Sequence, residues 1–171
     1  MRKFFHFFCL IVLCFSVACA GVQKTRSDKP SVSFELPDLT GKTHTLKDYT
    51  GQVVLLDLWA SWCVPCMQAL PLYAEFQKEY GPRGFSVVTV SLDEEREALD
   101  DFVENFFKGA KPPYIILHDQ EAKLAKQIIL DTMPTSLIID RSGQTVYLHT
   151  GFNRTKDEAL YRAKIEKALA Q

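Results

Sequence analysis

The hydrophobic positions of the chain fall into short runs of different period. The segment VVLLDL at 53–58 is apolar apart from one acidic residue, which is typical of a strand buried on both faces of a sheet. From Cys66 to Tyr80 the apolar residues recur near helical spacing, and GPRG at 81–84 ends that pattern. The run FSVVTVSLD at 85–93 then predicts a second strand.

The remaining elements follow from the same patterns and from turn residues. They predict a hairpin over 33–36 and 43–46, a helix over 94–107, a strand over 114–117, a helix over 122–130, strands over 135–139 and 145–150, and a last helix. The last helix is expected to open with a capping box of Thr155 and Glu158 and to bury a stripe made of Leu160, Tyr161, Ile165, Ala168 and Leu169. Strands that alternate with helices, followed by a hairpin and a helix, predict one α/β domain over 32–171, with helices on both faces of the sheet.

Residues 1–20 have the pattern of an export signal and are set apart from the fold. Two basic residues precede an apolar run from Phe4 to Val17, and small residues follow it. The run is shorter than the roughly 20 apolar residues that a membrane-spanning helix needs. We expect a polar tether, GVQKTRSDKPS at 21–31, between this signal and the domain.

The end of the signal fits two kinds of processing. The segment ACA at 18–20 has the small-x-small pattern of signal peptidase, which predicts a soluble product that begins at Gly21. Residues 16–19 also resemble a bacterial lipobox, although Ser16 stands in place of the usual leucine, and acylation of Cys19 would tether the domain to a membrane. Either route predicts a periplasmic or other extracytoplasmic location, where disulfides persist.

Two of the five cysteines remain in the fold once those of the signal are set aside. Cys63 and Cys66 would close a loop so short that it constrains little of the unfolded chain, so a structural staple is a poor explanation. The strand before them ends near Trp59, which places Cys63 at a helix N-terminus. Such a position lowers a thiol pKa from about 8.5 toward about 3.5 to 7.5, because the helix dipole and unpaired N–H groups favour an anion. We expect Cys63 to be the nucleophile and Cys66 the resolving thiol.

Asp57 interrupts the apolar strand. A carboxylate between two leucines is costly to bury without a task, so we expect it beneath the cysteine pair, where burial raises its pKa and lets it exchange the proton of Cys66. The alternative is a different strand register, with Asp57 at a sheet edge in water. Trp59 and Trp62 are explained more simply by packing, and Trp62 would also shield the nucleophile.

The stretch DLWASWCVPC at 57–66 resembles the active-site strand and turn of the thioredoxin superfamily. The matching positions are Asp57, Trp59, Trp62, Cys63, Pro65 and Cys66, and Pro71 matches the helix-kinking proline of that family. FELPDLTGKTHTLKDYTGQVVLLDLW and MPTSLIIDRSGQTVYLHTG resemble the TlpA-like and ResA-like extracytoplasmic branch. The resemblance implies a thioredoxin-like fold, with a central mixed sheet, an N-terminal β-hairpin, and a strand and helix inserted before a cis-proline.

The same resemblance implies a cis bond between Met133 and Pro134 beside the cysteine pair, whereas about 5 to 6% of X-Pro bonds are cis otherwise. Substrate would contact Trp62, Val64, Pro65, Met133 and Pro134. Two positions depart from the family: Thr89 stands where cytoplasmic thioredoxins have a lysine near the buried acid, and Val64 where ResA-like proteins often have glutamate. Val64 and Pro65 supply no cation to the thiolate, which favours a reductase over an oxidant.

The sequence therefore predicts a thiol:disulfide oxidoreductase that works through Cys63 and Cys66, without a cofactor or a metal. It would reduce disulfides of envelope proteins, and the resemblance suggests apocytochrome c as one target. It would take electrons from a membrane thiol donor. We expect the protein to be a monomer. The formal net charge is −1 and basic residues form no stripe, so nucleic acid is not an expected partner.

Two other functions on this fold remain open. A thiol peroxidase needs threonine or serine three residues before its reactive cysteine, where this chain has Ala60. A copper-binding chaperone would use thiolates and imidazole, but related carriers separate their cysteines by three residues, and His44, His118 and His149 are scattered. Each histidine is expected at the surface or with a hydrogen-bond partner of its own.

Overall fold

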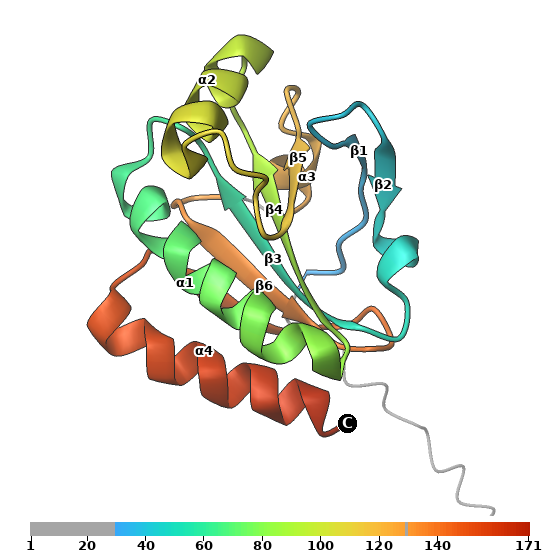
Figure 1. Ribbon diagram of the computed structural model, residues 1–171. Helices are drawn as coiled ribbons and strands as arrows, with labels where there is room; N and C mark the ends of the chain where they lie inside the picture. The colour runs from blue at the N-terminus through green and yellow to red at the C-terminus, as the bar shows by residue number, and fades with distance from the viewer. Residues whose placement is uncertain (1–29, 129) are drawn as a thin grey trace, which may run out of the picture.

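The computed structural model describes residues 30–128 and 130–171. At its centre lies a five-stranded sheet with the strand order β5-β4-β3-β6-β7 (Figure 1). The strands are β3 (Val53–Trp59), β4 (Phe85–Ser91), β5 (Ile115–His118), β6 (Thr135–Ile139) and β7 (Thr145–Thr150). Because β3 pairs in parallel with β4 and antiparallel with β6, the sheet is mixed, which confirms the expected architecture.

The predicted export signal at 1–20, its Cys19 and the first nine residues of the predicted tether, 21–29, lie outside the described residues. Pro30 already contacts the domain, since the hydroxyl of Thr145 donates to its carbonyl at 2.6 Å. Within the described ranges, none of the helices combines the length and the apolar character that a bilayer crossing requires.

Every residue of β3 is buried, and its side chains alternate between the two faces of the sheet. On one face, Val53, Leu55 and Trp59 share a core with residues of α1, α2 and α4. On the other face, Val54, Leu56 and Leu58 pack with residues of α3 and of the N-terminal segment. The bounds of these elements are α1 Val64–Tyr80, α2 Arg96–Phe107, α3 Lys123–Ile128 and α4 Arg154–Leu169, with the hairpin strands β1 Glu35–Pro37 and β2 Thr43–Thr45 and the short helical turns Leu46–Tyr49 and Gly81–Arg83.

The start of α4 differs from the prediction. The helix begins at Arg154, and the side chain of Asn153 accepts a hydrogen bond from the backbone N–H of Lys156, so the expected capping box of Thr155 and Glu158 is wrong. The carboxylate of Asp157 accepts in turn from the backbone N–H of Asn153 at 2.6 Å. The amide of Asn153 caps the helix because its oxygen accepts from a free N–H group of the first turn, that of Lys156.

The predicted buried stripe of α4 is also partly wrong. Tyr161, Ile165 and Ala168 are buried as expected, and Leu169 packs against the core from a partly buried position. Leu160, however, is 36% exposed. The helix lies alongside α1 (Figure 1), and its buried residues, Asp157, Tyr161, Ile165 and Ala168, form a narrow strip on one side of it.

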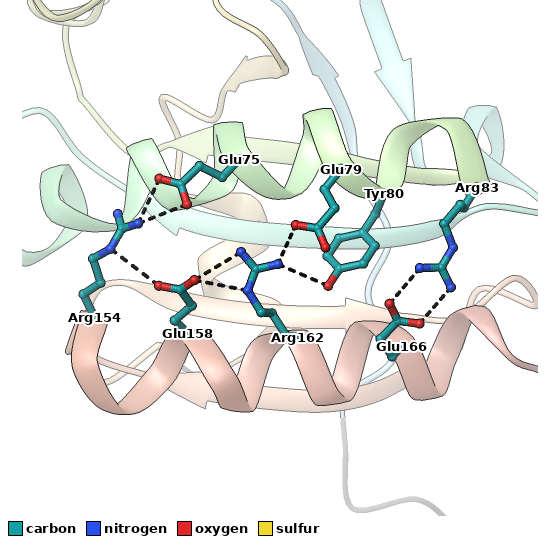
Figure 2. Close-up of polar contacts among 8 residues, drawn as sticks. All are labelled: Glu75, Glu79, Tyr80, Arg83, Arg154, Glu158, Arg162 and Glu166. Atoms are coloured by element: carbon teal, nitrogen blue, oxygen red, sulfur yellow. Dashed lines mark hydrogen bonds and ion pairs between the residues drawn. The ribbon is translucent and has the colours of Figure 1, made fainter.

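Charged side chains join α1 to α4 along their outer surface (Figure 2). Arg162 contacts Glu79 at 2.5 Å and Glu158 at 3.1 Å, and the same guanidinium donates to the hydroxyl of Tyr80. Two further interhelical pairs continue the row on either side: Arg154 with Glu75 at 2.8 Å, and Arg83 with Glu166 at 2.7 Å, the latter from the short turn that follows α1. The row, called the ion-pair ladder below, fixes the two helices side by side over one face of the sheet.

Candidate active site

Cys63 and Cys66 form a disulfide at the point where β3 gives way to α1. Cys63 is the N-cap residue of α1, and its Sγ accepts a hydrogen bond from the backbone N–H of Cys66 at 3.3 Å. Cys63 retains 6% of its surface in contact with solvent, whereas Cys66 is fully buried. Of the two cysteines, therefore, only Cys63 keeps any contact with solvent.

The turn that carries Cys63 is fastened by Asp93, which the sequence did not single out. Asp93 is buried just after β4, and its carboxylate accepts from the backbone N–H of Ser61 at 3.1 Å and from the hydroxyl of Ser61 at 2.7 Å. The hydroxyl of Ser91 donates to the same carboxylate at 2.6 Å. The sequence could have indicated this role. Neighbouring parallel strands end at the same edge of a sheet, so Asp93, just after β4, is expected beside the end of β3.

Asp57 lies where the sequence places it, fully buried in the middle of β3. Its side chain shares the face of Leu55 and Trp59, whose core also contains both cysteines. The alternative register, with Asp57 at a sheet edge in water, is therefore wrong. Burial raises the pKa of Asp57 to about 7, against the opposing effect of hydrogen bonds from Ser136 and Tyr73. The carboxyl can thus change its protonation state near neutral pH.

Hydroxyl groups surround one oxygen of Asp57, and their role was not predicted. The Ser136 hydroxyl donates to Oδ1 at 2.6 Å and the Tyr73 hydroxyl to the same atom at 3.0 Å, while Oδ2 has no partner among the described residues. Ser136 is paired with Asp57 across β3 and β6. A usable signal existed, since a buried tyrosine hydroxyl needs a polar partner and Asp57 was the one acid expected in this core. Thr89, the partner of Asp57 on β4, instead donates to the carbonyl of Ile115 at 3.4 Å.

The peptide bond between Met133 and Pro134 is cis, as the resemblance implied. Met133 and Trp62 line one hollow of about 320 Å³, whose other lining residues are Leu92, Ala122, Ala125, Lys126 and Leu130. Trp62 is 67% exposed, so its interpretation as a packing residue is wrong, whereas Trp59 is fully buried as expected. The side chain of Trp62 projects from the turn after β3, where the core does not extend to cover it.

The other predicted substrate residues do not line this hollow. Val64 is 59% exposed and Pro65 is exposed at the first turn of α1, while Pro134 is buried before β6. A larger hollow of about 630 Å³ lies between the N-terminal hairpin and α3, and it includes neither cysteine nor Asp57. The smaller hollow is not lined by these residues either, but one of its lining residues, Trp62, directly precedes Cys63 in the chain.

The three histidines of the domain each have a separate partner. His44 contacts Asp38 at 3.0 Å, His118 hydrogen-bonds to the carbonyl of Asp93 at 2.7 Å, and His149 contacts Asp157 at 3.2 Å. Over residues 30–128 and 130–171, no group of three or more metal-binding side chains is placed to hold an ion.

Comparison with known proteins places this geometry in a family. The model of the Redoxin family matches residues 25–167. A thiol-disulfide oxidoreductase ResA from Bacillus cereus is 30% identical over 164 residues, which cover 92% of each chain.

Two solved structures are similar in both sequence and fold. A Chlorobium tepidum protein that bears the name thiol:disulfide interchange protein DsbE is 34% identical, with a TM-score of 0.75 over 82% of this chain and 96% of its own. The exposed lipoprotein thioredoxin Etrx1 of Streptococcus pneumoniae is 33% identical, with a TM-score of 0.65 over 79% of this chain and 98% of its own. The chain therefore belongs to the Redoxin family and is a ResA-like member of the thioredoxin superfamily.

Proposed function

We propose that this protein is a thiol:disulfide oxidoreductase that reduces disulfides of other envelope proteins. The observation that carries the proposal is the Cys63–Cys66 disulfide at the start of α1, in which Cys63 keeps 6% exposure and Cys66 is fully buried. Relatives of this chain bear the names thiol-disulfide oxidoreductase and thiol:disulfide interchange protein, which fits the same chemistry.

The reaction begins with the reduced protein. The thiolate of Cys63 attacks one sulfur of a client disulfide, a mixed disulfide forms, and the other client sulfur leaves as a thiolate. Cys66 then loses its proton and attacks Sγ of Cys63, which releases the second client sulfur and closes the Cys63–Cys66 disulfide. Two electrons pass to the client, so a thiol donor must reduce the pair again before the next turn.

Asp57 is our candidate for the group that takes the proton of Cys66. It lies in the same core as both cysteines, and its pKa of about 7 leaves it able to accept a proton and to return it near neutral pH. The Asp57→Asn variant removes this acceptor, which should slow the resolving step by about 100-fold.

The client surface that we propose consists of Trp62, Val64, Pro65, Met133 and Pro134. Trp62 and Val64 are exposed apolar side chains on either side of Cys63, and Met133 continues the apolar surface across the hollow. Exposed apolar groups gathered around a reactive atom are a common mark of a protein-binding site. No charge in this set selects a client, which suits a reductase with several targets, apocytochrome c among them.

We also propose that the domain acts outside the cytoplasm as a monomer, held at a membrane by acylated Cys19 and supplied with electrons by a membrane thiol donor. The support is the export pattern of residues 1–20 and the similarity to a protein named as an exposed lipoprotein thioredoxin. The absence of a cation at Val64 and Pro65 favours the reductase direction.

Two cysteine variants test the proposed reaction. Cys63→Ser removes the nucleophile and should abolish the reduction of insulin disulfides. Cys66→Ser leaves the first attack intact and should accumulate mixed disulfides with clients, visible as bands that disappear on a reducing gel. The double variant is the control and should trap nothing. Insulin reduction by Cys63→Ser at the wild-type rate would overturn the proposal.

A further inference from the structure

Two hydroxyl groups donate to Oδ1 of Asp57, and a third hydroxyl donates to one of these two. Ser136 of β6 and Tyr73 of α1 both donate to this atom, and Tyr161 of α4 donates to Oγ of Ser136 at 2.7 Å. All three residues are at most 1% exposed. We call Ser136, Tyr73 and Tyr161 the hydroxyl cluster.

The hydrogen bonds from Tyr161 to Ser136 and from Ser136 to Asp57 both donate toward the carboxylate. Each hydroxyl has a single proton, so Ser136 gives its own to Asp57 and accepts the proton of Tyr161. The cluster therefore stabilises the ionised carboxylate, because hydrogen bonds to the charged form favour that form. Oδ1 already receives two donors, whereas Oδ2 is buried without a partner among the described residues, so a proton taken up by Asp57 belongs on Oδ2.

No cation assists the hydroxyl cluster in the part of the chain that the structure describes. Three titratable groups interact with Asp57, namely Tyr73 of α1, Tyr161 of α4 and Tyr114 just before β5, and Cys66 of α1 lies in the same hydrophobic core as these tyrosines. Burial raises the pKa of all three tyrosines above the ordinary value, so they are neutral near pH 7. Strand β4 contributes Thr89, whose hydroxyl is turned to another acceptor.

Two further titratable groups lie one step further out, beyond Tyr161. Asp157 acts on the hydroxyl of Tyr161, and it pairs with His149, whose ring packs edge-on against Tyr161 at 5.5 Å. Neither of them hydrogen-bonds to Asp57. Burial by the core and stabilisation by the hydroxyl cluster are therefore the two opposing influences on this carboxyl.

We propose that the hydroxyl cluster takes the place of a cation and sets the proton affinity of Asp57, and with it the pH range in which Oδ2 accepts the proton of Cys66. Ser136, Tyr73 and Tyr161 are positioning residues in this scheme. The inference rests on the proton role assigned to Asp57 under the proposed function, and it adds the groups that control that role.

Titration of Asp57 in the oxidised full-length protein tests the inference, because the disulfide keeps both cysteines from titrating. The signal is the 13C resonance of the Asp57 carboxyl, assigned by its loss in Asp57→Asn. Ser136→Ala should raise the pKa of Asp57 by about 1 to 2 units, the equivalent of one hydrogen bond to a charged group. Tyr73→Phe should act in the same direction, and Tyr161→Phe should do so more weakly, since it acts through Ser136.

Two further variants separate this effect from a general loss of structure. Tyr114→Phe removes another buried tyrosine hydroxyl of the same core, one that donates to the carbonyl of Leu70 at 3.3 Å, and should leave the pKa of Asp57 unchanged. Ser136→Thr keeps a hydroxyl at the position and should restore the wild-type pKa. Folded Ser136→Ala and Tyr73→Phe proteins in which Asp57 titrates as in the wild type would overturn the inference.

A rate measurement distinguishes failure of this inference from failure of the proposed function. The rate at which Cys66 releases a mixed disulfide on Cys63 is followed against pH, and its midpoint should move with the titration of Asp57 in Ser136→Ala. If Asp57→Asn resolves at the wild-type rate while Ser136→Ala still shifts the titration, the proton role of Asp57 fails and the control by the hydroxyl cluster stands. If Asp57→Asn is slow but Ser136→Ala shifts nothing, the hydroxyl cluster is not the controlling group.

Discussion

Burial and hydrogen bonding act on Asp57 in opposite directions, and burial has the larger effect. The carboxyl has lost all contact with solvent, which disfavours its charge, and two hydroxyl donors compensate for only part of that loss. The folded protein therefore holds a proton on Asp57 at pH values where the unfolded chain has released it.

This difference in proton binding makes the stability of the fold depend on pH. The folded pKa of Asp57 is about 7 and the unfolded value about 3.9, so stability falls as pH rises between them, by about 4 kcal/mol in total. Asp57→Asn cannot ionise, and its stability relative to the wild type should rise by that amount from pH 4 to pH 8. Urea unfolding of the oxidised proteins measures the difference at each pH.

An exposed acid provides the control for this measurement. Asp101→Asn removes a carboxyl from the solvent side of α2 and should give a difference from the wild type that stays nearly constant with pH. A constant difference for Asp57→Asn as well would show that the buried carboxyl binds its proton no more tightly in the folded state.

Single residues also mark where the sequence stopped being informative. Asp57, Cys63 and Cys66 were predictable because an acid in a buried strand and a close cysteine pair contradict the pattern around them. Ser136 does not stand out from the pattern around it, since a small polar residue is common in a strand. Its importance comes from the register that pairs β6 with β3, and a pairing between strands 79 positions apart is not written in local sequence.

The contacts between α4 and α1 are partly electrostatic. The residues of the ion-pair ladder are mostly between a third and a half exposed, so each pair contributes little alone, because solvent screens it. The guanidinium of Arg162 also lies 5.1 Å from the ring centre of Phe76. The ladder thus orients α4, which carries Tyr161, more than it stabilises the fold.

The central pair of the ladder allows a quantitative test. A double-mutant cycle on Arg162 and Glu79, with Arg162→Gln and Glu79→Gln, should give a coupling of about 0.5 kcal/mol at low salt. The coupling should decrease in 1 M salt, where the screening length is about 3 Å. The matched control is Arg96 and Asp100, an exposed pair at 2.8 Å within α2, which should couple no more strongly. A coupling that is large and independent of salt would contradict this account.

Element types were predictable from the sequence, and element ends were less so. Strong apolar runs and helical spacing gave the strands and the α-helices of the described domain, because those patterns report burial directly, but they did not give the short helical turns Leu46–Tyr49 and Gly81–Arg83. The start of α4 was misplaced because Thr155 and Asn153 are both good N-cap residues. The choice between them depends on where β7 ends, which local sequence does not fix.

The whole described domain directs its chemistry to one edge. Strands β3 and β4 run in parallel, and their ends bring the turn of Cys63 beside Asp93 and the hollow lined by Trp62 and Met133. Pro30 and the residues that follow it cover the opposite face of the sheet, through contacts of Val32 and Phe34 in the second core. Four residues that line the hollow, Leu92, Ala122, Ala125 and Leu130, pack in the same second core.

The proposed lipid anchor can be tested on the entire protein. If Cys19 is acylated, the wild type should sediment with membranes, and Cys19→Ser should appear in the soluble fraction with unchanged insulin reduction. Cys14→Ser alters another cysteine of the export signal and should remain with the membranes. Recovery of the wild type in the soluble fraction would favour cleavage after residue 20 and contradict the anchor.

The two tryptophans flank the turn that leads to the disulfide, and they differ completely in solvent access, at 0% for Trp59 and 67% for Trp62. Their emission can therefore be separated with a soluble quencher such as iodide, which reaches Trp62 alone. Protection of Trp62 would register the arrival of a client, while the indole of Trp59, in the same core as both sulfur atoms, would register the opening of the disulfide. The intrinsic fluorescence of the two tryptophans would therefore report both client binding and redox state, without any added dye.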